Sequence, residues 1–261
     1  MATERGGASG DPAGRQPTGA LGRAARLIGP RAKPTVTNGY LDALGDGDVK
    51  RSAVQLAMQS RVLPLIYERA WRPILSGAST IGLREKQESR LMRAMLALSQ
   101  GDTVLDVACG PGNTTRRLID SIGSTGLVVG VDAAPAMLRR AVLDTPSSNV
   151  AYVRADAEAL PFADGTFDGV SCFGALYLVD RPFAVIDELV RVLAPGSNIA
   201  ILTSCHRLGQ RLGFVADAAT TGSGFRWFGP HDITSALEDR GLVDLHQEIH
   251  GVMQYVGATK P

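Results

Sequence analysis

Residues 104–115 read Val104-Leu-Asp-Val-Ala-Cys-Gly-Pro-Gly-Asn-Thr-Thr115, a short apolar run followed by a glycine turn and then a helical pattern. This order predicts a buried strand that leads directly into a helix. Gly110 and Gly112 would let the backbone approach a ligand closely, beside helix amides that carry partial positive charge. We expect Asp106, just before the turn, to fix the loop through its backbone amides. An ordinary strand–helix turn would look similar, because a lone GxG is weak evidence.

A second apolar run, residues 127–131, ends in a carboxylate at Asp132. At the tip of a neighbouring strand, that carboxylate can accept hydrogen bonds from both hydroxyls of a ribose. The alternative is a helix cap, since a helix is expected to begin at Pro135. Both an NAD site and an S-adenosylmethionine site share these elements. A dinucleotide site also favours a third small residue where this chain has Thr115, so the fit to NAD is poor.

The chain alternates between strand and helix patterns after residue 101. Strands are expected at 103–108, 127–131, 150–154, 167–173 and 198–203, and helices at 84–98, 113–122, 135–143, 182–193 and 230–240. Residues 242–249 and 252–259 flank His250-Gly251 and predict a hairpin. The predicted fold class is α/β, a doubly wound, Rossmann-like, mostly parallel sheet with a late antiparallel strand and helices on both faces.

The predicted core, residues 101–261, follows two segments of different character. Residues 1–37 repeat Gly, Ala, Pro and Arg, with only Glu4 and Asp11 acidic. This composition predicts a disordered tail, and an organellar transit peptide is the alternative. Residues 38–100 predict an N-terminal helical segment. Its apolar and aromatic side chains suit a lid over an acceptor pocket, or helices that simply pack on the sheet.

Composition excludes several classes of function. Hydrophobic residues make up 44% of the chain and charged residues 20%, as in ordinary globular proteins. The formal net charge of +1 gives no broad field for nucleic acid or anionic lipid. Three cysteines without a CxxC pair predict reduced thiols and no metal site. We therefore expect a cytoplasmic monomer or homodimer with no integral membrane segment and no nucleic-acid partner.

A third motif, Arg154-Ala-Asp-Ala-Glu-Ala-Leu-Pro-Phe-Ala-Asp-Gly-Thr-Phe-Asp168, resembles the segment of class I S-adenosylmethionine-dependent methyltransferases that closes over adenine. The three motifs stand in the order of that family, and the late hairpin is similar too. The resemblance covers residues 83–261 and favours the branch with ubiquinone and menaquinone C-methyltransferases. It implies S-adenosylmethionine as cofactor and methyl transfer to an oxygen or carbon of a small, largely apolar acceptor: a quinone, polyketide, terpenoid or lipid-like molecule. It does not name the acceptor.

The resemblance also implies which residues bind the methionine end of the cofactor. Gly110 and Gly112 would pass close to it, and Asp106 stands where the family orients this loop. The carbonyl of Phe173, at the end of the fourth core strand, would face the methionine amine. Cys109 stands where many relatives have glycine, and we interpret it as a small buried thiol rather than a nucleophile.

The adenosine end has its own set of implied residues. Asp132 would hold the ribose, and Asp156 would accept a hydrogen bond from the adenine amino group. The backbone amide of Ala157 would serve a ring nitrogen. Ala133 and Met137 would supply apolar contacts, although Met137 is equally well explained as core.

Proton acceptors are expected at the carboxyl ends of the strands, where ligands bind in α/β folds. His206 follows the fifth core strand and Tyr177 the fourth, so both are candidate catalytic residues. His206 has a simpler interpretation as a capping or exposed histidine. Two rival functions stay open: an NAD-dependent oxidoreductase and a non-catalytic S-adenosylmethionine-binding regulatory module.

Overall fold

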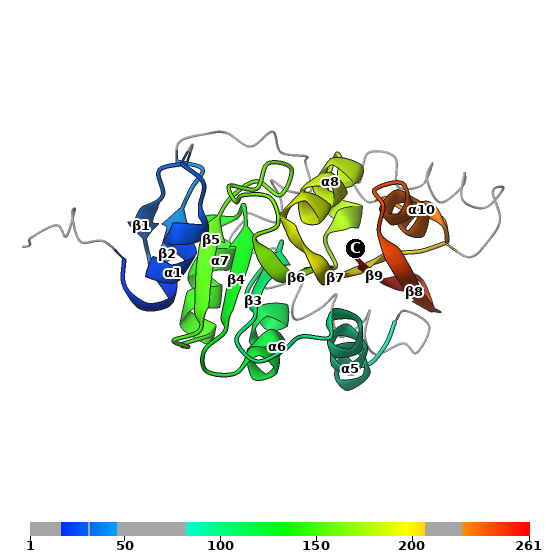
Figure 1. Cartoon of the computed structure of the whole chain (residues 1–261), viewed down its shortest axis with the longest axis horizontal. Helices are drawn as coiled ribbons and strands as arrows, with labels where there is room; N and C mark the ends of the chain where they lie inside the picture. The colour runs from blue at the N-terminus through cyan, green and yellow to red at the C-terminus, as the bar shows by residue number, and fades with distance from the viewer. Residues whose placement is uncertain (1–16, 31, 46–81, 207–225) are drawn as a thin grey trace, which may run out of the picture.

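The computed structural model describes residues 17–30, 32–45, 82–206 and 226–261. These residues build one nine-stranded sheet of order β1-β2-β5-β4-β3-β6-β7-β9-β8 (Figure 1). The strands are β1 Thr35–Thr37, β2 Tyr40–Asp42, β3 Thr103–Val107, β4 Leu127–Asp132, β5 Val150–Arg154, β6 Phe167–Phe173, β7 Leu193–Ser204, β8 Val243–His250 and β9 Met253–Thr259. The helices are α1 Gly19–Leu27, α5 Glu85–Leu96, α6 Asn113–Ile122, α7 Pro135–Asp144, α8 Pro182–Val192 and α10 Asp232–Glu238, with a short 3-10 turn, η2, at Leu176–Leu178.

Strands β2, β5, β4, β3, β6 and β7 run parallel, as the alternating pattern predicts. The final hairpin pairs antiparallel onto β7 through β9, which confirms the predicted late antiparallel strand. The chain winds from β3 outward to β4 and β5, and then returns to the other side of β3 to form β6. This reversal places the topological switch point at the carboxyl end of β3, where ligands bind in open α/β sheets.

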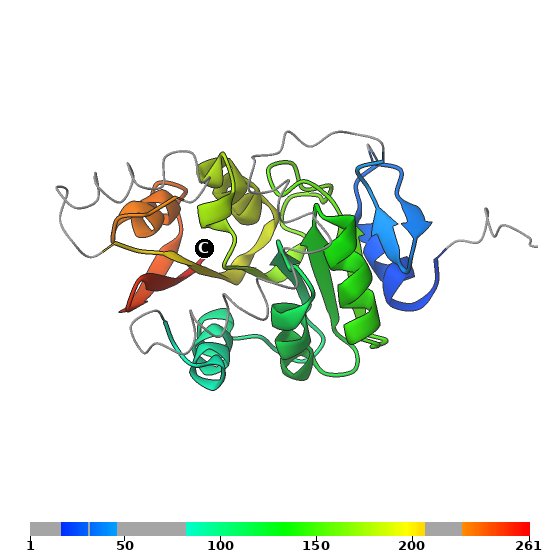
Figure 2. The same ribbon diagram turned by 180° about the vertical axis from the view of Figure 1, so that it is seen from behind.

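Two apolar layers cover the sheet, because successive strand residues face opposite sides. Leu105 and Val107 of β3 face the layer that holds side chains of α1, α8 and α10. Val104 faces the other layer, together with side chains of α5, α6 and α7. Figures 1 and 2 show α8 and α10 on one side of the sheet and α5 and α6 on the other. The prediction of helices on both faces is confirmed.

The N-terminal part departs from the prediction. Residues 17–30 and 32–37 were expected to be disordered, but they include α1 and β1, so this expectation is wrong for these two elements. Ala20 and Ala24 lie one helical turn apart and are buried against the sheet. The composition of the whole segment conceals this narrow apolar stripe, because glycine, proline and arginine dominate the average. Residues 1–16 and residues 46–81, which include most of the expected lid segment, lie outside the described residues. Among the described helices, none is long and apolar enough to cross a membrane.

Candidate functional site

The glycine turn after β3 is held by the carboxylate at the tip of β4. Asp132 accepts a hydrogen bond from the Gly110 amide at 2.9 Å and from the Ala134 amide at 2.8 Å. The Cys109 amide donates to the Val131 carbonyl at 2.9 Å, which joins the turn to β4 a second time. Burial raises the pKa of Asp132, and its backbone hydrogen bonds oppose that shift. Asp132 therefore shapes the loop on which a ligand would rest.

Asp106 does not make the contacts predicted for it. Its carboxylate accepts hydrogen bonds from the hydroxyls of Thr115, at 2.7 Å, and Ser171, at 2.9 Å, rather than from loop amides. The side chain of Asp106 points to the α6 side of the sheet, because it alternates with Leu105 along β3. Asp106 thus joins β3 to α6 and β6. The sequence analysis considered Thr115 only as an argument against an NAD site. In the structure, its buried hydroxyl is the donor that joins α6 to Asp106.

Burial raises the pKa of Asp106 from 3.8 to about 6, against the two hydroxyl hydrogen bonds and the charge of Arg117. Between pH 3.8 and about pH 6, Asp106 keeps its proton in the folded chain but loses it in the unfolded chain. Its contribution to the free energy of unfolding therefore falls as the pH rises through this range. Asparagine fits the same space without charge. We expect the difference in unfolding free energy between Asp106→Asn and wild type to shift in favour of the variant by about 2 kcal/mol when the pH is raised from about 4.5 to about 7.5.

Urea denaturation at both pH values measures this gain. The control is Asp187→Asn, which removes an exposed carboxylate that pairs with Arg240 at 2.7 Å. A stability difference between Asp106→Asn and wild type that does not change with pH would show that Asp106 titrates normally.

The two glycines of the turn have different physical roles. Gly110 has φ +54°, and a Cβ added there would meet nothing within 4 Å, so a ligand can approach this backbone. Gly112 has φ +81° and is the N-cap of α6. A Cβ added at Gly112 would lie 2.5 Å from the Tyr152 hydroxyl oxygen. The prediction that both glycines serve close ligand approach therefore fits Gly110, whereas Gly112 is required by internal packing. Ala108, at φ +55°, is a third left-handed residue in the turn and the one that is not glycine.

The loop after β5 carries Asp156 near its start, and the Asp156 Oδ1 accepts a hydrogen bond from the Glu158 amide at 2.9 Å. Asp156 and Ala157 are half-buried, beside the tip of β4. Ala133 and Met137 are also half-buried; Ala133 directly follows Asp132 at the neighbouring tip, and Met137 lies in the first turn of α7. The structure therefore brings the adenosine-end candidates together at one edge of the sheet.

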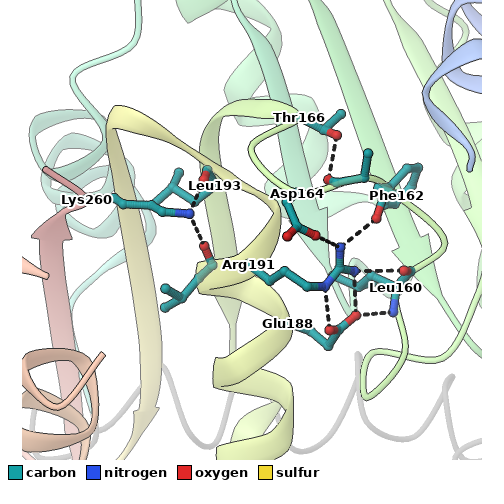
Figure 3. A network of polar contacts seen from close by, with 10 residues as sticks. Leu160, Phe162, Asp164, Thr166, Glu188, Arg191, Leu193 and Lys260 are labelled. Atoms are coloured by element: carbon teal, nitrogen blue, oxygen red, sulfur yellow. Dashed lines mark hydrogen bonds and ion pairs between the residues drawn. The ribbon is translucent and has the colours of Figure 1, made fainter. Parts of the chain in front are cut away.

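Farther along, this loop is held by a charged pair on α8, as Figure 3 shows. The Arg191 guanidinium donates to the carbonyls of Leu160, at 3.0 Å, and Phe162, at 2.7 Å. Glu188 bonds the Arg191 Nε at 2.7 Å and accepts from the Leu160 amide at the same distance. Arg191 also pairs with Asp164 at 2.8 Å. The sequence analysis missed Glu188 and Arg191, whose i, i+3 spacing on a helix was the available signal.

The candidate catalytic residues lie at the carboxyl ends of β6 and β7. Tyr177 is buried in η2, and its carbonyl accepts from the Arg226 amide at 2.8 Å. The His206 amide donates to the Phe228 carbonyl at 3.0 Å, so residues 226–228 run beside both candidates. The His206 Nδ1 is buried and has no hydrogen-bond partner in the described part of the chain. The capping alternative concerns the residues after His206, which lie outside the described residues.

Phe173 is half-buried at the end of β6, next to Leu202 of β7. Cys109 is buried, and burial raises its pKa well above 9.0, so it stays a neutral thiol near neutral pH. This agrees with its interpretation as a packing residue. In the described ranges, no group of three His, Cys, Asp or Glu side chains is arranged to hold a metal ion.

Comparisons with known proteins agree with this geometry. Residues 104–196 match the family model of a methyltransferase domain. The chain is 41% identical over 114 residues to a 2-phytyl-1,4-naphtoquinone methyltransferase of Thermosynechococcus vestitus, which covers 42% of this chain and 50% of that protein. It is 32% identical over 139 residues to a demethylmenaquinone methyltransferase of Bacillus licheniformis, with 52% and 60% covered.

Among solved structures, the geranyl diphosphate C-methyltransferase of Streptomyces coelicolor is similar, with a TM-score of 0.58 and 18% identity. The match covers 68% of this chain and 81% of that one, and it shows a shared fold. This chain spans about half the length of the curated relatives that it matches. Residues 104–196 therefore match a methyltransferase domain, and the chain shares its Rossmann-like fold with a solved methyltransferase.

Proposed function

We propose that this protein is an S-adenosylmethionine-dependent methyltransferase that acts on a carbon or oxygen of a small, largely apolar acceptor, with quinone-like rings as the first class to test. The observation that carries the proposal is the meeting of Asp132 and the open Gly110 turn at one sheet edge, with Asp156 on the next strand. The relatives' names, a phytyl-naphthoquinone and a demethylmenaquinone methyltransferase, favour this acceptor class.

The residues at this edge fit the proposed cofactor. Gly110 donates to Asp132 Oδ2 and Ala134 donates to Oδ1. Because a carboxylate oxygen can accept more than one hydrogen bond, both oxygens could also accept from a ribose hydroxyl. Asp156 has one oxygen engaged by an amide and another for an adenine amino group. Ala133 and Met137 would give apolar contact on the adenosine side, and the Ala157 amide would serve a ring nitrogen.

At the other end, Gly110 offers the open backbone beside which the methionine part would pass, and Phe173 would present its carbonyl to the amine. Asp106 and Gly112 act indirectly, because they hold α6 and the turn in place. The bound cofactor supplies an activated methyl group on sulfur. The protein must then align the acceptor with that group and exclude water, which contributes to catalysis through orientation.

His206 is the proposed proton acceptor, since its buried Nδ1 has no partner in the described part of the chain. On a hydroquinone, proton transfer from a ring hydroxyl to His206 would leave a phenolate, and the phenolate makes a ring carbon or its own oxygen nucleophilic. Tyr177 is proposed to border the acceptor from η2. We further propose that the protein works in the cytoplasm, as a monomer or homodimer, without nucleic acid.

Calorimetric titration tests the cofactor, and labelled-methyl transfer tests the reaction. We expect S-adenosylhomocysteine to bind and NADH not to bind. Label should then pass to reduced prenylated naphthoquinones but not to oxidised ones, because only the reduced ring has an ionisable hydroxyl. Binding of NADH instead of S-adenosylhomocysteine would favour an oxidoreductase. Cofactor binding with no transfer to any small phenol, quinol, polyketide or terpenoid would favour a regulatory module.

A further inference from the structure

The N-terminal segment, described over residues 17–30 and 32–45, contacts the adenosine side of the proposed cofactor site at two separate places. Near its middle, the Gly29 amide donates to the Pro161 carbonyl at 2.8 Å, and Ile28 forms a β-bridge with Phe162. Both partners belong to the loop after β5 that carries Asp156 near its start. The segment is therefore built onto the loop that would close over adenine.

The second contact lies at the carboxyl edge of the sheet. Asp42 ends β2 and stands in register with Arg154 of β5, which in turn stands in register with Asp132 of β4. The three residues are thus side by side on three neighbouring parallel strands. Asp42 and Arg154 form an ion pair of 2.9 Å, and their side chains are only 14% and 12% exposed. Such burial makes the pair less screened by solvent than a surface ion pair.

Arg154 joins this pair to the tip that carries Asp132. Its Nε donates to the Ala133 carbonyl at 3.4 Å, and its Nη1 donates to the Gly45 carbonyl at 3.0 Å. Asp42 Oδ1 accepts from the amides of Leu44 and Gly45, at 3.1 and 3.0 Å. The guanidinium therefore ties the turn after β2 to the backbone that directly follows Asp132.

We propose that residues 17–30 and 32–45 act as a clamp on the adenosine end of the cofactor site, in which Asp42 and Arg154 are positioning residues. This inference rests on the proposed function. The clamp holds the loop after β5 through Gly29 and holds the tip of β4 through Arg154. Neither Asp42 nor Arg154 needs to touch the ligand, because each acts through the backbone that it fixes.

The test uses the full-length chain with Asp42→Asn, Arg154→Gln and the double variant. Each is titrated with S-adenosylhomocysteine and with 5′-methylthioadenosine, which lacks the amino-acid end. We expect each single variant to raise both dissociation constants by the same factor, about threefold to tenfold, and the double variant to be little worse than either single one. The control, Asp144→Asn, breaks an exposed ion pair with Arg140 of 2.6 Å and should change neither constant.

The outcomes separate this inference from the proposed function. If wild type binds neither ligand, the proposed function fails and the clamp fails with it. If wild type binds both ligands and the variants bind them equally well, only the clamp is overturned. A loss confined to S-adenosylhomocysteine would also overturn it, because the effect would then lie at the methionine end. A lower melting temperature with unchanged affinities would show that the pair is merely structural.

Discussion

The Asp132→Ala variant is expected to bind S-adenosylhomocysteine about 1–3 kcal/mol more weakly than wild type, which is roughly a fivefold to a 150-fold loss. Two contributions add here. The variant lacks the proposed acceptor for the ribose hydroxyls, and it also releases the Gly110 amide, which the carboxylate holds at 2.9 Å. The turn beneath the methionine end would therefore loosen when the adenosine end loses its carboxylate.

Asp132→Asn is the matched comparison, because it keeps one oxygen acceptor and the size of the side chain. We expect its affinity to lie between those of wild type and Asp132→Ala, as measured by calorimetry at equal ionic strength. Urea denaturation of both variants shows whether the fold survives. An Asp132→Ala protein that stays folded and binds S-adenosylhomocysteine as tightly as wild type would contradict the proposed placement of the ribose.

Gly112→Ala is expected to destabilise the protein by about 2–4 kcal/mol, since left-handed strain adds to an overpacked contact. The added Cβ would lie 2.5 Å from the Tyr152 hydroxyl oxygen and 3.3 Å from the Ala141 Cβ. Tyr152→Phe removes the first of these atoms. Because that hydroxyl is buried and has no hydrogen-bond partner among the described residues, its removal alone should change stability by less than about 1 kcal/mol.

The double variant Gly112→Ala/Tyr152→Phe should recover part of the loss and leave about 1–2 kcal/mol, the strain of a left-handed alanine. Gly196→Ala supplies that strain alone, because Gly196 has φ +77° and nothing within 4 Å of an added Cβ. Urea denaturation of the four variants measures each part. If Tyr152→Phe gives no rescue, the contact with the hydroxyl is not what makes glycine necessary at residue 112.

The sequence predicted the core of the fold because its signals are local. Apolar runs, the glycine turn and Pro135 at the start of a helix each act within a few residues, and all the core strands and helices formed near their expected places. The carboxylates at the tips of β4 and β5 followed from topology, since parallel strands end at one edge.

The features that the sequence analysis did not predict depend on contacts between distant parts of the chain. The hydrogen bond from Ser171 to Asp106 spans 65 residues, and no local pattern announces it. Asp106 was assigned to the turn because it is near in sequence, but strand alternation points it beneath α6. The pairing of β2 with β5 likewise joins residues 41–42 to residues 153–154. The signal that the N-terminal segment would pack was short: Ala20 and Ala24 of α1 are buried, and Leu21, Ala25 and Leu27 pack partly buried against the core.

The pairing of β2 beside β5 also bears on how this domain can be isolated. A strand at the rim of a sheet exposes unpaired amides and carbonyls that invite other chains to add to it. Strand β5 is almost wholly apolar, Val-Ala-Tyr-Val-Arg, and β2 covers part of its outer side. A fragment begun at residue 101 would leave that side bare. Such a fragment would tend to associate through β5, however well its own core had folded.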